Sequence, residues 1–213
     1  MSTSTPTTPK TLLTVLISGN GTNLQALIDA CASPSSVLSN CTITHVVSNR
    51  KAAYGLVRAQ TAGIPTTYHN LVPYTRKHLA AIPTPKPNDD TTPTDPEKTT
   101  QIEAAKASAR AAYDADLAHL LLHPPTPPAT KPHLIICAGW MHVLTPSFLD
   151  PIAAAGIDVI NLHPALPGAY NGANAIARAY ADWRAGKVDR TGVMVHRVVR
   201  EVDMGLPLVV REV

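Results

Sequence analysis

The sequence feature that most constrains the fold is a repeated alternation of short apolar runs and segments with helical character. Apolar runs at 11–17, 42–48 and 133–139 are each followed by a loop and then by a stretch that favours a helix. Short apolar runs bounded by glycine and proline predict buried strands. Strands that alternate with helices predict a parallel sheet with right-handed crossovers and helices on both faces. We therefore expect an α/β fold with a doubly wound, mostly parallel sheet.

Further elements follow from the same patterns of apolar spacing. The stretch from Gly156 to Gly172 begins as a strand, because Ile157, Val159 and Ile160 are apolar and β-branched. The other expected strands are 64–68, 191–199 and 206–213, and the expected helices are 24–32, 53–62, 101–122 and 173–185, with a short helix near Pro146.

One domain is expected, because 213 residues suffice for a single well-buried core. Residues 1–10 have no apolar region and indicate a disordered leader, while 11–213 carry the α/β alternation. Residues 83–100 hold five prolines and almost no apolar side chain, which indicates a low-complexity surface insertion within the domain. Residues 124–132 indicate a stiff polar connector.

Composition excludes several classes of function. The formal net charge of +3 and the lack of a basic run argue against a nucleic-acid or membrane-surface partner. Three cysteines without C-x-x-C spacing, Cys31, Cys41 and Cys137, argue against a disulfide framework and a zinc site. No apolar stretch reaches transmembrane length. We expect a soluble, cytoplasmic protein without a bound metal.

A glycine-rich loop, S-G-N-G-T-N, lies between the first strand and the first helix. Free backbone N–H groups and the positive end of a helix dipole suit a phosphate group there. Leu24 replaces the third glycine of the dinucleotide fingerprint, and no G-K-[ST] of a Walker loop follows. We interpret Gly21, Thr22 and Asn23 as a site for a single phosphate group; the alternative is an ordinary strand–helix turn.

Two polar side chains, Asn161 and His163, lie where the strand of the Gly156–Gly172 stretch runs into a turn. Residues two apart on a strand face the same side, so an amide and an imidazole project together. Ligands bind at the carboxyl ends of strands in open α/β sheets. An amide can stabilise an oxyanion and an imidazole can move a proton. The alternative is an asparagine that caps the turn beside a surface histidine.

Two other segments supply candidates for the same site. Asp203, in a loop between two late strands, would orient the His163 ring and favour its protonated form if it reached that ring. Met141, Val143 and Leu144 follow the strand at 133–139 and would line an apolar pocket. The alternatives are a turn aspartate and ordinary core residues.

Four motifs, I-S-G-N-G-T-N-L-Q-A-L-I-D-A, I-I-C-A-G-W-M-H-V-L, N-L-H-P-A-L-P-G and E-V-D-M-G-L-P-L-V, occur in this order. In that order they resemble the glycinamide ribonucleotide transformylase family, also called phosphoribosylglycinamide formyltransferases, with a Rossmann-like fold. The N-L-H-P-A-L-P-G form is similar to the fungal branch. The H-P-x-L element alone also occurs in methionyl-tRNA formyltransferase and formyltetrahydrofolate deformylase, whose additional domains have no room in this chain.

The resemblance implies roles for individual residues. Gly21, Thr22 and Asn23 match the loop for the ribonucleotide phosphate, and Asn161, His163 and Asp203 match the catalytic trio. The expected folate contacts are Arg110, Met141, His142, Val143, Leu144, Asn161, Val199, Arg200, Glu201, Val202 and Asp203. His142 is a departure from the family, because an arginine is common there in bacterial relatives.

The resemblance also implies a reaction, in which the amine of glycinamide ribonucleotide attacks the formyl carbon of 10-formyltetrahydrofolate. Neither a metal nor a covalent enzyme intermediate is expected. Two other functions stay open: a formyltetrahydrofolate hydrolase or another folate-dependent formyltransferase, and a non-catalytic nucleotide-binding module with this fold. Relatives continue beyond the position of Val213 into a long helix, so we expect an apolar patch on one face of the sheet.

Overall fold

The computed structural model describes residues 9–82, 96–124 and 130–213. Most of the expected leader and residues 83–95 of the expected insertion lie outside the described residues. The remaining residues of that insertion, from Pro96 on, are helical, so the sequence boundary at 100 differs from the structure.

A seven-stranded sheet forms the centre of the molecule, in the order β3-β2-β1-β4-β5-β6-β7. Strands β1 to β5 run parallel to one another, whereas β6 is antiparallel to both β5 and β7. The mostly parallel sheet expected from the sequence is therefore confirmed. The strands are β1 (Thr11–Ile17), β2 (Cys41–Ser48), β3 (Thr66–Tyr68), β4 (Leu134–Cys137), β5 (Asp158–His163), β6 (Gly192–Arg197) and β7 (Pro207–Glu212).

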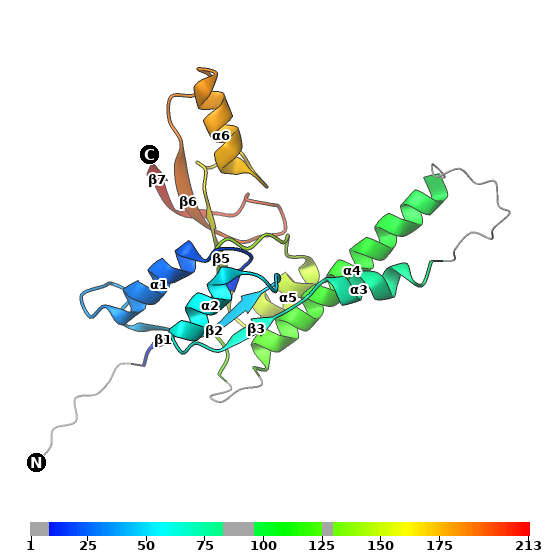
Figure 1. The fold of residues 1–213 in the computed structure, drawn as a ribbon, viewed down its shortest axis with the longest axis horizontal. Helices are drawn as coiled ribbons and strands as arrows, with labels where there is room; N and C mark the ends of the chain where they lie inside the picture. The colour runs from blue at the N-terminus through cyan, green and yellow to red at the C-terminus, as the bar shows by residue number, and fades with distance from the viewer. Residues whose placement is uncertain (1–8, 83–95, 125–129) are drawn as a thin grey trace, which may run out of the picture.

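Helices cover both faces of the parallel part of the sheet (Figure 1). One face packs against α1 and α2, and the other against α4 and α5, while α3 lies along α4. The helices are α1 (Thr22–Ala32), α2 (Tyr54–Thr61), α3 (Val72–Leu79), α4 (Pro96–Leu122), α5 (Pro146–Ala154) and α6 (Ala175–Arg184).

The alternation of side chains along β1 explains these two layers. Val15 and Ile17 face the cluster that includes Leu24 of α1, whereas Leu16 faces the cluster that includes Leu117 of α4 and Phe148 of α5. Each of these side chains is fully buried. A strand that is apolar on both faces must be covered twice, so the doubly wound fold follows from the composition of β1.

Helix α3 was not expected from the sequence. It has a proline in its first turn but no buried residue, so it lacks the apolar face that would reveal a helix. It is joined to α4 by a hydrogen bond from the Tyr74 hydroxyl to Asp116 Oδ2 at 2.7 Å.

The strand order reverses between β1 and β4, which is the position where open α/β sheets bind ligands. The loops after these two strands are tied together there. Ser18 Oγ accepts the backbone N–H of Met141 at 2.7 Å, and the N–H of Ser18 donates to the carbonyl of Gly139 at 3.0 Å. The glycine loop and the segment from Met141 thus lie side by side at this position of the sheet.

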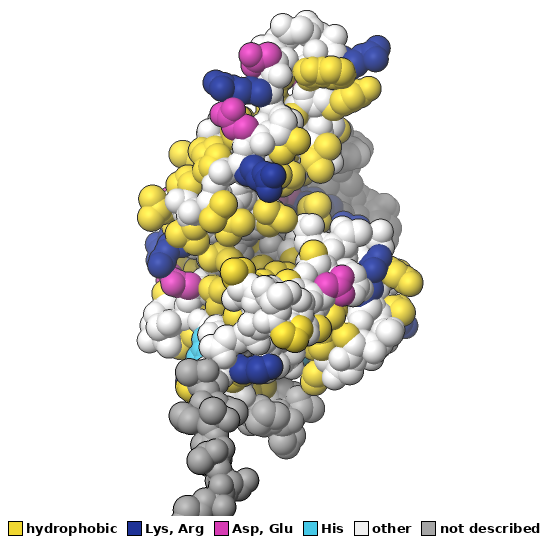
Figure 2. All heavy atoms as spheres, turned by 90° about the vertical axis from the view of Figure 1, so that its left-hand side faces the viewer, with side chains coloured by type: hydrophobic (Ala, Val, Ile, Leu, Met, Phe, Trp, Pro, Cys, Tyr) yellow, Lys and Arg dark blue, Asp and Glu magenta, His cyan; other side chains and the backbone are white. Residues whose placement is uncertain are grey.

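Strand β7 is exposed along its whole length. Its apolar side chains Leu208, Val209 and Val210 lie in solvent, as do Tyr180 and Trp183 of α6. In Figure 2, hydrophobic side chains gather over the upper part of the molecule, which carries these elements. Exposed apolar side chains are therefore present on β7 and α6.

Candidate active site

The glycine loop leads directly into α1, which begins at Thr22, two residues earlier than the sequence pattern indicated. Gly21 has φ 75° and forms the N-cap without a side-chain hydrogen bond. The first backbone bond of the helix is from Gln25 N–H to the Gly21 carbonyl. The N–H groups of Thr22 and Asn23 lie before that bond and are thus available to an anion.

Helix α2 packs against this loop and is hydrogen-bonded to it. The Arg58 Nε donates to the Asn20 carbonyl at 2.9 Å, and the N–H of Gly55 donates to the Gly19 carbonyl at 3.1 Å. A Cβ on Gly21 would lie 2.5 Å from the Cα of Gly55, so the two backbones approach too closely for any side chain. The close approach fixes the path of the loop and explains why two glycines are needed.

The segment after β4 presents two apolar side chains to solvent, because Met141 is 66% and Val143 is 56% exposed. Leu144 instead is buried in the core, and its expected contact with a folate stays a prediction. His142 turns away from solvent, and its Nε2 lies 2.8 Å from Oδ1 of Asp114 on α4. The segment thus presents the apolar side chains of Met141 and Val143 to solvent, while His142 and Leu144 are held inside the protein.

Asp114 is a fully buried carboxylate that the sequence analysis did not single out. Besides His142 it accepts the backbone N–H of Thr145 at 2.6 Å. Neighbouring aromatic groups titrate abnormally: burial, and then the charge of Asp114, raise the pKa of Tyr113. Burial also lowers the pKa of His69, whose Nε2 donates a hydrogen bond to the Tyr113 carbonyl. The carboxylate therefore fixes both ends of the His142–Thr145 turn from inside the protein.

Asn161, His163 and Asp203 are brought together by the fold, although Asp203 is distant in sequence. His163 lies at the end of β5 and is 4% exposed, and its Nδ1 is 3.4 Å from Asp203 Oδ2. Asn161 Nδ2 is 3.5 Å from Asp203 Oδ1. His163 Nε2 is buried and has no hydrogen-bond partner among the described residues. The ring therefore faces a carboxylate through Nδ1, while its second nitrogen is buried and unpaired in the described part of the chain.

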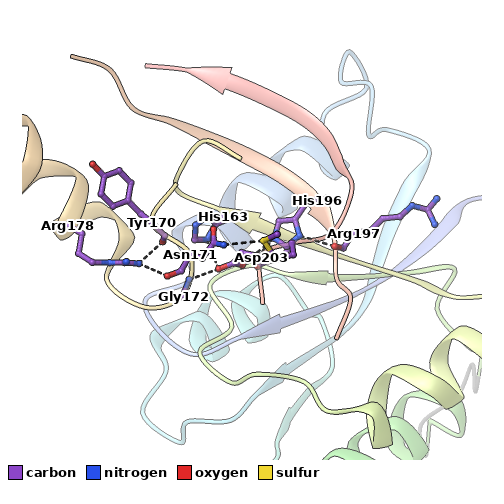
Figure 3. A network of polar contacts seen from close by, with 10 residues as sticks. His163, Tyr170, Asn171, Gly172, Arg178, His196, Arg197 and Asp203 are labelled. Atoms are coloured by element: carbon purple, nitrogen blue, oxygen red, sulfur yellow. Dashed lines mark hydrogen bonds and ion pairs between the residues drawn. The ribbon is translucent and has the colours of Figure 1, made fainter. Parts of the chain in front are cut away.

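The loop before α6 holds the Asp203 carboxylate. The N–H of Gly172 donates to Asp203 Oδ2 at 2.7 Å. Arg178 of α6 in turn donates to the carbonyls of Tyr170 and Asn171, each at 2.6 Å, so the loop is clamped just before Gly172 (Figure 3). Asp203 itself has φ 58°, a left-handed conformation that aspartate and asparagine tolerate better than most residues.

The other expected folate contacts are dispersed. In the loop before Asp203, Val199 and Val202 are 39% and 42% exposed, and Glu201 is also exposed. Arg200 pairs with Asp150 of α5, with both carboxylate oxygens at 3.0 Å. Arg110 is exposed on α4, where its positive charge acts on Glu103 of the same helix. The structure thus does not bring Arg110 into the cluster around His163.

A second buried histidine, His196 on β6, was missed in the sequence. It lies opposite Asn161 in the β5–β6 pair and is 2% exposed. Strand alternation would have revealed it, because Gly192 and Met194, four and two residues earlier, are buried on the same face. A histidine in that series is a buried polar group that needs partners.

Two classes of feature are not found in the described residues. They contain no group of three or more His, Cys, Asp or Glu side chains arranged to hold a metal ion. Their helices include none that is long and apolar enough to cross a membrane.

Comparison with known proteins identifies the family. The family model described as "Formyl transferase" matches residues 12–213. The chain belongs to the formyl transferase family. Among the relatives of this formyl transferase, phosphoribosylglycinamide formyltransferase of Schizosaccharomyces pombe is 43% identical over 201 residues, which cover 94% of this chain and 81% of that protein. The enzyme of the same name from Saccharomyces cerevisiae is 40% identical over 205 residues, with the same coverage of 94% and 81%.

Solved structures agree with these relatives. The glycinamide ribonucleotide transformylase 1 of Symbiobacterium toebii superposes with a TM-score of 0.66 at 28% identity, covering 96% of this formyl transferase and 73% of that chain. The Rossmann-like fold and the resemblance to the fungal branch that the sequence indicated are thus confirmed.

Proposed function

We propose that this formyl transferase moves the formyl group of 10-formyltetrahydrofolate to the amine of glycinamide ribonucleotide, in purine synthesis. The observation that carries the proposal is the pairing of His163 Nδ1 with Asp203 at 3.4 Å while His163 Nε2 is buried without a partner among the described residues. Relatives named phosphoribosylglycinamide formyltransferase support the identity of both substrates.

The ribonucleotide phosphate binds at the start of α1. Gly21, Thr22 and Asn23 supply backbone N–H groups and the positive end of the helix dipole, which suit a phosphate dianion. Because β1 lies near the centre of the sheet and β5 is separated from it only by β4, a ligand bound at this loop extends along the carboxyl edge towards His163.

The folate binds across the neighbouring loops. Met141 and Val143 offer exposed apolar side chains to a flat ring system, and Val199 and Val202 flank it from the loop before Asp203. Leu144 acts from the core beneath this surface, and His142 acts by holding the segment to Asp114 rather than by reaching the ligand.

The chemistry is a direct transfer. The amine nitrogen forms a bond to the formyl carbon, and the bond from that carbon to the folate nitrogen breaks. Asn161 and a protonated His163 stabilise the oxyanion of the tetrahedral intermediate. The Asp203 carboxylate faces Nδ1 of the ring and orients it, and the proton lost by the amine ends on the departing folate nitrogen. These side chains supply the charge stabilisation and the proton route themselves, so the proposed reaction uses no metal. We expect it to take place in the cytoplasm between small-molecule substrates.

Steady-state turnover tests the function. Consumption of 10-formyltetrahydrofolate is followed with and without glycinamide ribonucleotide. We expect turnover only when the ribonucleotide is present. Turnover that is equally fast without it would identify a hydrolase instead, and no turnover in either mixture would identify a non-catalytic module.

A further inference from the structure

His196 is a buried histidine that touches two of the three proposed catalytic side chains. Its Nε2 lies 3.2 Å from Nδ2 of Asn161 and 3.4 Å from Oδ1 of Asp203. In Figure 3 its ring lies beside Asp203, on the side towards the Arg197 backbone. Because the ring is 2% exposed, its hydrogen bonds are made to the protein and not to bulk solvent.

The two ring nitrogens have partners of opposite kind. His196 Nδ1 is 2.9 Å from the carbonyl oxygen of Arg197, and a carbonyl only accepts, so Nδ1 carries the hydrogen. In a neutral imidazole the other nitrogen is then an acceptor. Nε2 therefore accepts an N–H of Asn161. Nε2 also lies 3.4 Å from Asp203 Oδ1, a contact for which the structure gives no hydrogen bond in the described residues.

The ring consequently fixes which end of the Asn161 amide, the NH₂ group or the oxygen, faces His196 and Asp203. Nδ2 lies between two acceptors, the lone pair of His196 and the Asp203 carboxylate, where the amide oxygen would meet only other acceptors. One N–H is bound to His196. The other makes a long hydrogen bond to Asp203 Oδ1 at 3.5 Å, a weak contact that a developing oxyanion can replace.

We propose that His196 is a positioning residue for the formyl transfer. Through the lone pair on Nε2 it holds the Asn161 amide in the orientation in which an N–H points to the oxyanion. This inference rests on the proposed function, because it assigns His196 an effect on the proposed oxyanion donor.

Two substitutions distinguish the effect of the Nε2 lone pair on activity from the effect of the ring's volume. His196→Leu removes the acceptor, and we expect kcat to fall roughly 10²-fold, the lower range for the loss of an oxyanion donor, with KM for the ribonucleotide little changed. His196→Gln restores an oxygen acceptor near Nε2, and we expect it to recover at least tenfold of the lost kcat. His45→Leu is the matched control, because His45 is a half-buried strand histidine bonded only to Thr67 in the structure; its kcat should equal that of the wild type.

The proposal is overturned if His196→Leu keeps wild-type kcat, or if His196→Gln is no better than His196→Leu. Long-range ¹H–¹⁵N NMR spectra of the wild-type protein give a second readout that needs no variant to fold. We expect the His196 ring to be neutral with hydrogen on Nδ1 and none on Nε2; hydrogen on Nε2 would also overturn the proposal. An inactive wild type would instead reject the proposed function, and the NMR result would still test the placement of Asn161.

Discussion

His163 Nδ1 and Asp203 Oδ2 lie 3.4 Å apart, and the same carboxylate oxygen accepts the N–H of Gly172 at 2.7 Å. The carboxylate is thus fixed by the backbone before it meets the ring. Because the position of Asp203 does not depend on His163, the pair is already formed in the protein without substrate, as expected for a preorganised acid–base site.

The Asp203→Asn variant tests the charge of this carboxylate. Asparagine also tolerates the φ of 58° at this position, so the substitution removes the negative charge with little backbone strain. We expect kcat to fall by about 10²–10⁴, with a small change in KM, since the protonated form of His163 loses its partner. Steady-state kinetics beside His163→Ala check this, and near wild-type kcat in either variant would reject the acid–base assignment.

The close approach of the glycine loop to α2 predicts different effects for two glycines of similar backbone conformation. Gly21 has φ 75° and no space for a Cβ, whereas Gly63 has φ 70° and nothing within 4 Å of its Cβ position. Gly63→Ala should cost about 1–2 kcal/mol of stability from conformation alone. Gly21→Ala should cost more and also raise KM for the ribonucleotide, because the loop must shift.

Thermal unfolding and steady-state kinetics of the two glycine variants make this comparison. An unchanged KM for the ribonucleotide in Gly21→Ala would show that the loop does not hold the phosphate.

The buried carboxylate of Asp114 predicts a link between stability and folate binding. Asp114→Ala would leave His142 Nε2 and the Thr145 N–H without their acceptor, at about 1–3 kcal/mol for each unpaired group. The turn from His142 to Thr145 would loosen, so KM for the folate should rise. Asp116→Ala is the control on the same helix, because its exposed carboxylate accepts the Tyr74 hydroxyl of α3 and does not touch the turn from His142 to Thr145. Equal folate KM values in the two variants would argue against the role of Asp114.

Burial of two histidines predicts a loss of stability in mild acid. Burial lowers the pKa of both His45 and His69 below the ordinary value near 6.5. As pH falls through 6.5, the unfolded chain binds protons before the folded chain does, so the free energy of unfolding decreases. The stabilisation is complete above that pH and is lost between 6.5 and the lower folded pKa values.

Melting temperatures at pH 7.5 and 5.5 measure this effect. The decrease should be smaller in the His45→Gln, His69→Gln double variant than in the wild type. His119→Gln, at an exposed position, should behave as the wild type does. Identical decreases in the double variant and the wild type would contradict the effect of burial.

Much of the parallel sheet could be predicted from the sequence because its signals are local. Apolar runs such as 11–17 must be covered on both faces, and the glycine loop before Thr22 marks the start of a helix. The direction of β6 and β7 was not specified, because alternation along a strand is the same for parallel and antiparallel neighbours.

The site was only partly visible in the sequence. Asn161 and His163 could be grouped because two residues on one strand share a face. The contact of His163 with Asp203 could not be predicted from spacing, and only the family resemblance grouped the two residues, since the contact depends on the path of the loop after β6 and on the Gly172 N–H. Asp114 was hidden for a similar reason: its partners His142 and Thr145 come from another element.

The fate of the formyl carbon is the direct test of whether this formyl transferase transfers that carbon to glycinamide ribonucleotide. The wild-type protein is mixed with 10-formyltetrahydrofolate that carries ¹³C in its formyl group, and the label is followed by NMR with and without glycinamide ribonucleotide. We expect the label to appear in the formamide of the ribonucleotide product. When the ribonucleotide is left out, we expect the label to stay on the folate. Label released as formate at the same rate in both mixtures would contradict it.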